Sequence, residues 1–185
     1  KWHNVASTWN SSLPYYAICT AEAQAIMNYN NAVPRIARSR WVTPEYTSTN
    51  RNPYREWIGA QIRADGWGYA CAGNPELAAE FAYRDACWTH RANGIYGEMM
   101  FAAIMAAAFI VSDPVELVNI GLSEIPQNCK LAEACRAALS QVPACQDFHD
   151  FMDWVEAHYG DLSGVHTVNN ALVVIGSLIF GQMDF

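Results

Sequence analysis

The sequence predicts an all-α fold in a single domain of 185 residues. Helix-start signals recur along the chain, apolar residues repeat at helical spacing, and no segment shows the alternation typical of a strand. Hydrophobic residues make up 52% of the chain and charged residues 16%, so a chain of this length can bury a substantial core. We therefore expect one multi-helix bundle over residues 1–185.

The N-terminal half carries three helix-cap signals, each a polar residue followed by helix formers. They are Thr20 before a helix from Ala21 to Tyr29, Asn52 before Pro53, and Asn74 before Pro75, Glu76 and a helix to about Trp88. Between the first two signals, residues 30–52 are polar and are broken by Pro34 and Pro44. We expect no helix there, and residues 33–51 are the one candidate for a linker.

The C-terminal half carries further signals of the same kind. They are Asp113 before Pro114 with Glu116 in capping-box position, Asn128 before a helix over residues 129–142, and helices over 148–159 and 168–180 that end at Gly160 and Gly181. The segment from Ile95 to Val111 is apolar on all sides and rich in alanine. Because small residues let neighbouring helices approach closely, we expect this helix at the centre of the bundle.

Charge and cysteine usage limit the class of protein. The net charge is -7 and no basic stripe is present, which argues against a nucleic-acid partner. The most apolar run, residues 99–111, is too short to cross a bilayer, and no signal peptide is visible, so we expect no membrane partner. The six cysteines form no tight framework, and we expect reduced thiols in a cytoplasmic protein. Cys129, Cys135, Cys145 and His149 lack a close ligand pair, so we expect no zinc site.

The first group of candidate site residues lies in residues 57–68. Gln61 and Asp65 place polar groups among glycines in an otherwise apolar segment. Such glycines permit close approach of a ligand or of another helix. The alternative is structural, with a helix that ends in a tight turn at Gly66 and Gly68 and with Asp65 bonded to the backbone.

Two further groups stand where helices are expected to begin. His90 and Asn93 precede the central helix, where free backbone N–H groups can bind an anion such as a pyrophosphate, or where His90 can simply pack in a capped turn. His166, Asn169 and Asn170 precede the last helix, where the amides either cap the helix or bind a base or ribose.

Longer segments resemble a bacterial branch of the ADP-ribosylglycohydrolase family. The resemblance spans roughly residues 10–185, and the matching segments are residues 52–65, 73–79, 83–86, 89–90, 93–97 and the tail 166–185. The resemblance implies an all-α fold whose cleft holds two divalent cations, Mg²⁺ or Mn²⁺. It also implies hydrolysis of an ADP-ribosyl N- or O-glycosidic bond, through an oxocarbenium-like state that two metals and a positioned water can stabilise.

The resemblance also assigns candidate residues for binding ADP-ribose or an ADP-ribosylated substrate. His90 matches the family histidine near bound ADP-ribose, and Gln61, Asp65 and Asn93 are expected in the same cleft. His166 and Asn169 complete the predicted substrate-binding set.

The chain departs from the family pattern at the metal site. The family's metal ligands lie in an N-terminal Thr-Asp-Asp motif and a C-terminal Gly-x-Asp-Thr-Asp motif, and neither occurs in these 185 residues. We therefore expect no metal ligand and no catalytic residue here, and we interpret the chain as an internal fragment that is inactive alone and associates with the missing segments or with other copies. The alternatives are a catalytically inactive binding or structural protein of the same fold, and a hydrolase of this fold with another substrate.

Overall fold

The computed structural model describes residues 20–36 and 43–181, and within these residues the regular elements are helices. The α-helices are α2 (Ala21–Ile36), α3 (Pro44–Thr49), α4 (Asp65–Ala70), α5 (Pro75–Ala86), α6 (Asn93–Ala107), α7 (Pro114–Ser123), α8 (Lys130–Gln141), α9 (Phe148–Tyr159) and α10 (Thr167–Phe180). Two short 3₁₀ helices, η2 (Gln61–Arg63) and η3 (Val142–Ala144), lie between them. The all-α prediction is confirmed.

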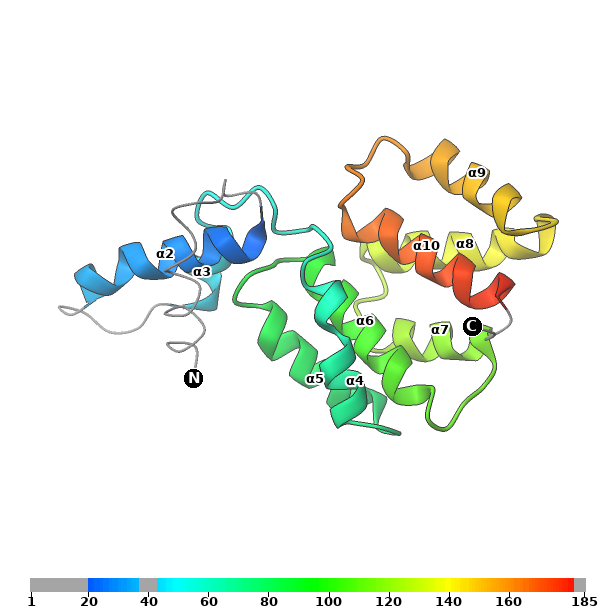
Figure 1. Ribbon diagram of the computed structural model, residues 1–185, viewed down its shortest axis with the longest axis horizontal. Helices are drawn as coiled ribbons and strands as arrows, with labels where there is room; N and C mark the ends of the chain where they lie inside the picture. The colour runs from blue at the N-terminus through cyan, green and yellow to red at the C-terminus, as the bar shows by residue number, and fades with distance from the viewer. Residues whose placement is uncertain (1–19, 37–42, 182–185) are drawn as a thin grey trace.

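The helices fall into three groups in space (Figure 1). Helices α2 and α3 pack against each other at one end of the molecule. Helices α4, α5 and α6 form the middle, and α7 to α10 lie at the other end. Helix α6 contacts α4, α5, α7, α8 and α10, so it is the element on which the bundle is assembled.

Helix α6 is buried along almost its whole length, as its composition predicts. The alanines Ala102, Ala103, Ala106 and Ala107 are completely buried. Small residues on its neighbours bring the backbones together: a Cβ on Gly121 of α7 would lie 2.6 Å from Cγ1 of Ile104. Since neither helix has room for a larger side chain at this contact, the approach of α7 to α6 depends on that glycine.

Three predicted N-caps are confirmed. Thr20 Oγ1 accepts a hydrogen bond from the backbone N–H of Ala23 at 3.1 Å. The Asn74 side chain accepts from Leu77 N at 3.2 Å, and Asp113 accepts from Glu116 N at 2.7 Å. Each cap satisfies a backbone donor that has no partner within its helix, which fixes where α2, α5 and α7 begin.

The helix expected to begin at Asn52 and Pro53 is absent, and this prediction is wrong. The Asn52 Nδ2 donates to Ser48 O and to Thr89 O, both at 3.0 Å, and its Oδ1, the atom that would cap a helix, accepts from Tyr54 N at 3.1 Å within a turn. Residues 52–60 form a chain of turns before η2.

Four other predicted boundaries need correction. Helix α2 continues to Ile36 instead of ending near Tyr29. Helix α3 lies inside the expected linker 33–51, because Pro44 is its first residue and not a breaker. Residues 37–42 of that linker lie outside the described residues. Cys129, not Asn128, is the N-cap of α8. The tight turn considered at Gly66 and Gly68 does not occur, because both glycines lie within α4.

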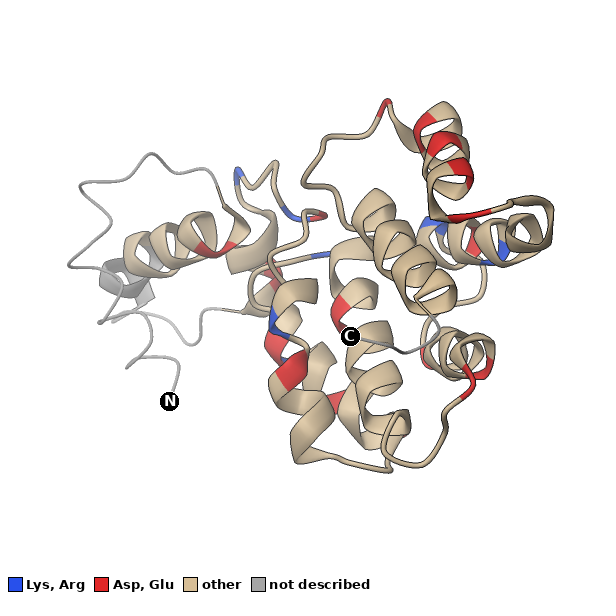
Figure 2. Cartoon of the chain, turned by 45° about the vertical axis from the view of Figure 1, so that its right-hand side comes forward, with Lys and Arg blue, Asp and Glu red and all other residues tan. Residues whose placement is uncertain are grey.

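The described residues also show the state of the cysteines and the location of the charged side chains. Cys71, Cys87, Cys129, Cys135 and Cys145 are free, and Cys19 lies outside the described residues. Acidic residues lie on several helices, among them α5 and α9, whereas most of the helix surface carries no charge (Figure 2). Within residues 20–36 and 43–181, no helix is long and apolar enough to cross a membrane.

Candidate functional site

Three segments that are distant in sequence converge at the N-terminus of α6. The backbone of Glu56 accepts a hydrogen bond from Thr167 N at 3.0 Å, and Ile58 N donates to Val165 O at 2.8 Å. These bonds flank the isolated antiparallel bridge between Trp57 and His166. The turns at 52–60 and the start of α10 are therefore held together as a short ladder.

The third segment, residues 89–97, joins this ladder through its backbone and its glycines. Arg91 N donates to Arg55 O at 2.9 Å. A Cβ on Gly94 would collide with that same carbonyl, and a Cβ on Gly97 would lie 2.5 Å from Oγ1 of Thr167. Both glycines are therefore required for the approach of the segments.

A pocket of about 460 Å³ opens beside this convergence. Its wall comes from the turns, from the starts of α6, α8 and α10, and from the end of α9 with the loop that follows. The lining residues are Glu56, Asn93, Lys130, Glu133, Ala134, His158, Tyr159, Asp161, Leu162, His166 and Val168. We call this space the α6 pocket. Of the predicted substrate-binding residues, it brings together Asn93 and His166.

His166 presents a hydrogen-bond donor at the α6 pocket. Its Nδ1 accepts from Val168 N at 3.1 Å, so the ring caps α10. Burial lowers the pKa of His166, Glu56 opposes this effect, and Lys130 adds to it. A neutral ring whose Nδ1 accepts a hydrogen bond must carry its proton on Nε2.

Asn93 connects two walls of the pocket. Its Nδ2 donates to Oε2 of Glu56 at 2.7 Å, and its Oδ1 accepts from Leu131 N at 2.9 Å. The same amide therefore anchors the turns to α6 and satisfies a free backbone donor at the start of α8. Oε1 of Glu56 is left as an acceptor at the pocket.

Gln61 and His90 lie behind the pocket rather than on its wall. Gln61 Oε1 accepts from the hydroxyl of Thr167 at 2.7 Å. His90 is completely buried, and its Nδ1 lies 2.8 Å from Oγ1 of Thr89. Burial lowers the pKa of His90 to about 4, while the charge of Glu22 opposes this effect, so the ring is neutral at neutral pH.

A cluster of charged residues surrounds Arg63 on the side of α6 that faces α2 and α5. Arg63 Nε donates to Oδ2 of Asp85 at 2.5 Å, and Nη1 donates to Oε1 of Glu22 at 2.7 Å. Nη2 donates to Oγ1 of Thr89 at 2.8 Å. Glu98, completely buried on α6, lies 3.6 Å from Nε. We call Glu22, Arg63, Asp85, Thr89 and Glu98 the Arg63 cluster.

The carboxyls of the Arg63 cluster differ in charge. Burial raises the pKa of Glu98 to about 10 against the attraction of Arg63, and the charge of Asp85 adds to the rise. Burial acts against ionisation of Asp85, but Arg63 and hydrogen bonds keep the pKa of Asp85 below its ordinary value. Oε1 of Glu98 accepts from Trp67 Nε1 at 3.0 Å, whereas Oε2 has no hydrogen-bond partner among the described residues. We therefore assign the proton to Oε2, and Glu98 is neutral beside an ionised Asp85.

The Arg63 cluster does not fit a divalent cation. The guanidinium stands between the carboxylates where a cation would have to bind, and its pKa is raised by Glu98, Asp85 and Glu22 against the effect of burial. Within the described part of the chain, no three His, Cys, Asp or Glu side chains are grouped to hold a metal ion. The described residues therefore supply no ligand set for the cations that the family resemblance implies.

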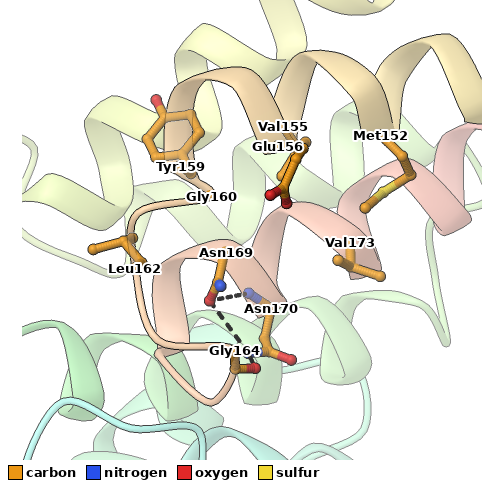
Figure 3. Close-up of a pocket in the computed structure, with 10 residues that line it drawn as sticks. All are labelled: Met152, Val155, Glu156, Tyr159, Gly160, Leu162, Gly164, Asn169, Asn170 and Val173. Carbon is orange, nitrogen blue, oxygen red and sulfur yellow. Dashed lines mark hydrogen bonds between the residues drawn. The ribbon is translucent and has the colours of Figure 1, made fainter.

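A second pocket of about 250 Å³ lies between α9 and the start of α10 (Figure 3). Asn169 lines it together with Asn170 and Gly164, while Glu156 and Tyr159 approach from α9. Tyr159 and Leu162 also line the α6 pocket, so the loop between α9 and α10 separates the two spaces. Asn169 and His166 therefore face different pockets.

Asp65 takes no part in either pocket. It is exposed at the first turn of α4. Sequence reasoning also missed the Arg63 cluster as a unit. One signal for it was available: Glu98 is the single charged residue in the apolar segment 95–111, and a charge in such a setting requires partners.

Comparisons with known proteins identify the family of the chain. The family model described as ADP-ribosylglycohydrolase matches residues 1–184. Comparisons with curated proteins and with solved structures gave no match. The matched range includes the turns, the α6 pocket and the Arg63 cluster. The chain belongs to the ADP-ribosylglycohydrolase family, a family of hydrolases.

Proposed function

We propose that the complete protein is a metal-dependent hydrolase of an ADP-ribosyl N- or O-glycosidic bond, and that the α6 pocket contributes to binding the substrate. The observation that carries the proposal is the convergence of three family segments, 52–65, 89–97 and 166–171, beside one pocket. A concave pocket on which a few polar groups converge is typical of a binding site.

The lining of the α6 pocket suits a ligand rich in hydroxyl groups. Glu56, Glu133 and Asp161 are acceptors, and Nε2 of His166 is a donor. Lys130 is the one lysine or arginine in the lining. A ribose with vicinal hydroxyls can both donate to the carboxylates and accept from the imidazole, so we place ribose recognition here. Cleavage itself requires cations whose ligands the described residues do not provide, and we assign no catalytic step to them.

We place the other predicted residues in supporting roles. His90 and Gln61 lie behind the α6 pocket and support it from there. His90 contacts Thr89, and Gln61 accepts a hydrogen bond from Thr167. Asn93 fixes the orientation of Glu56. Asn169 faces the neighbouring pocket, and Asp65 is exposed on α4, so neither is part of the ribose site that we propose.

The test is calorimetric titration of ADP-ribose into the chain, with and without Mn²⁺. We expect binding that weakens about 10-fold or more in Glu56→Gln, because a hydrogen bond to a charged group contributes about 1.5–3 kcal/mol. The matched control is Glu116→Gln, an exposed position on α7. Equal affinity of Glu56→Gln and the unchanged chain would exclude the α6 pocket as the site. Absence of binding in all samples would favour the alternative described next.

The alternative function is a catalytically inactive binding or structural protein of the same fold. The observation that favours it is the Arg63 cluster, in which buried carboxyls are neutralised by an arginine or by a proton. It predicts that the full-length protein binds neither Mg²⁺ nor Mn²⁺ and releases no ADP-ribose from ADP-ribosylated protein. Metal-dependent release of ADP-ribose by the full-length protein would exclude it.

A further inference from the structure

The loop between α9 and α10 is attached to the first turn of α10 by two amide side chains. Asn169 Nδ2 donates to Ser163 O at 3.1 Å. Asn170 Nδ2 donates to Gly164 O at 3.0 Å and to His166 O at 2.8 Å. One amide group thus binds two carbonyls that lie on either side of Val165.

These bonds complete the pairing of the loop backbone. The carbonyl of Val165 accepts from Ile58 N at 2.8 Å, and that of Ser163 also accepts from His166 N at 2.8 Å. Each carbonyl from Ser163 to His166 therefore has a donor, although the loop lies at the surface. Surface loops usually leave such groups to water, so this backbone is held unusually firmly.

Asn170 is the member of the pair that acts on His166. The backbone bond from Asn170 N to His166 O is long, at 3.4 Å, so the first carbonyl of α10 is weakly held by the helix itself. The side chain of Asn170 reaches the same oxygen at 2.8 Å and holds it more closely. Asn169 accepts from Asn170 N at 3.0 Å, which restrains the second asparagine in turn.

We propose that Asn170 is a positioning residue for His166: its side-chain amide holds the backbone on which the imidazole caps α10 and presents Nε2–H to the α6 pocket. The contribution of His166 to substrate binding rests on the proposed function, whereas the positioning of its ring by Asn170 does not. It assigns Asn170 a role that its place in the second pocket alone would not suggest, because it acts through the loop that separates the two pockets.

The ring of His166 has charged neighbours whose effects must be separated from that of Asn170. Glu56 lies on the turns, Lys130 and Glu133 on α8, His158 at the end of α9, and Asp161 on the loop. None of them is removed when Asn170 is changed. A change in the ring tautomer of an Asn170 variant at constant pH therefore reports on the position of the ring.

The experiment is nitrogen NMR of the histidine rings in the ¹⁵N-labelled chain at neutral pH. The signals of His166 are assigned by their loss in His166→Gln. In the unchanged chain we expect two well-separated ring-nitrogen signals, typical of a fixed Nε2–H tautomer. In Asn170→Leu, which removes both donors at similar size, we expect the signals to move toward each other as the two tautomers exchange. Asn170→Gln keeps the amide and should restore much of the separation.

The matched control is Asn74→Leu, which removes an asparagine that caps a different helix, α5. It should leave the His166 signals unchanged. Unchanged signals in Asn170→Leu, or a protonated or Nδ1–H ring in the unchanged chain, would overturn the inference, and the second outcome applies even if Asn170→Leu fails to fold. ADP-ribose titration gives the independent reading: absence of binding by a chain with a fixed Nε2–H ring would count against the proposed function and not against the role of Asn170.

Discussion

Arg63 donates from Nε to Oδ2 of Asp85 at 2.5 Å, and this bond joins η2 to α5 beside the buried carboxyl of Glu98. The two residues are separated by 22 positions, so their pairing is a product of the tertiary fold. Because the guanidinium also bonds Glu22 and Thr89, it links α2, η2, α5 and the segment before α6.

Removal of Arg63 should destabilise the bundle. Arg63→Met leaves Asp85 and Glu22 without a cation in a largely buried site, and we expect the free energy of unfolding to fall by about 3 kcal/mol, the low end for a buried pair because these side chains are partly exposed. Urea denaturation measures this difference. The control is Arg84→Met, whose ion pair with Glu80 is exposed and should contribute less than about 1 kcal/mol. Equal effects of the two variants would contradict the role of Arg63.

Glu98 should make the free energy of unfolding fall as the pH rises from about 4.5 to about 10. Its pKa in the folded chain is about 10, above the ordinary 4.5, so the folded form holds an extra proton between these values. Stability therefore falls as the pH rises through that window, by up to about 1.4 kcal/mol per pH unit. In Glu98→Gln this decline should be absent. Between pH 7 and 9 the free energy of unfolding of the variant should therefore rise relative to that of the unchanged chain. Parallel stability curves for the two proteins would contradict the protonated state of Glu98.

His90 should have the opposite effect in acid. Its pKa in the folded chain is about 4, below the ordinary 6.5, because it is buried as a neutral ring. The unfolded chain binds more protons between these values, so the contribution of His90 to stability is lost as the pH falls from 6.5 toward 4. His90→Asn should reduce this loss, whereas His149→Asn, at an exposed position, should leave it as it is. The comparison is made by urea denaturation at several acidic pH values.

Two glycines should respond in opposite directions to the same substitution. Gly121→Ala places a Cβ 2.6 Å from Ile104 Cγ1 and 2.9 Å from the backbone oxygen of Met100, and we expect a loss of about 1–3 kcal/mol. Gly66 lies in α4 with no atom near the position of an added Cβ. Gly66→Ala should stabilise by up to about 1 kcal/mol through helix propensity. Thermal denaturation of both variants checks the pair, and a loss at Gly66 would contradict the open space there.

The helices could be predicted where local chemistry decides them. Asn74 and Asp113 have the side chain, the following proline and the apolar repeat that a helix start requires, and both cap helices in the structure. Asn52 has the same local pattern and its Oδ1 accepts from Tyr54 N, but no helix follows, because the backbone of residues 55–58 bonds to Arg91, Val165 and Thr167. A local cap signal carries no information about such tertiary contacts.

The candidate site could be predicted only in part for the same reason. His166 and Asn93 were identified, and they line one pocket because α6 and α10 begin side by side. The Arg63 cluster depends on contacts between residues as distant as Glu22 and Glu98, which no local pattern records. Asn170 was identified only as a capping or binding amide, and its action on His166 could not be predicted because it depends on the path of the loop from Ser163 to His166.

The enclosure of α6 by five other helices has a consequence for how the molecule opens. Its backbone amides can meet solvent only when the surrounding bundle separates, so their hydrogen exchange should report global unfolding. Among the described helices, α2 and α3 pack mainly on each other, and polar links such as the bond from Thr47 to Trp88 O join them to the bundle. They can detach at lower free energy. The first proteolytic cut should therefore fall on the α2 and α3 side and leave a resistant core that begins near the turns.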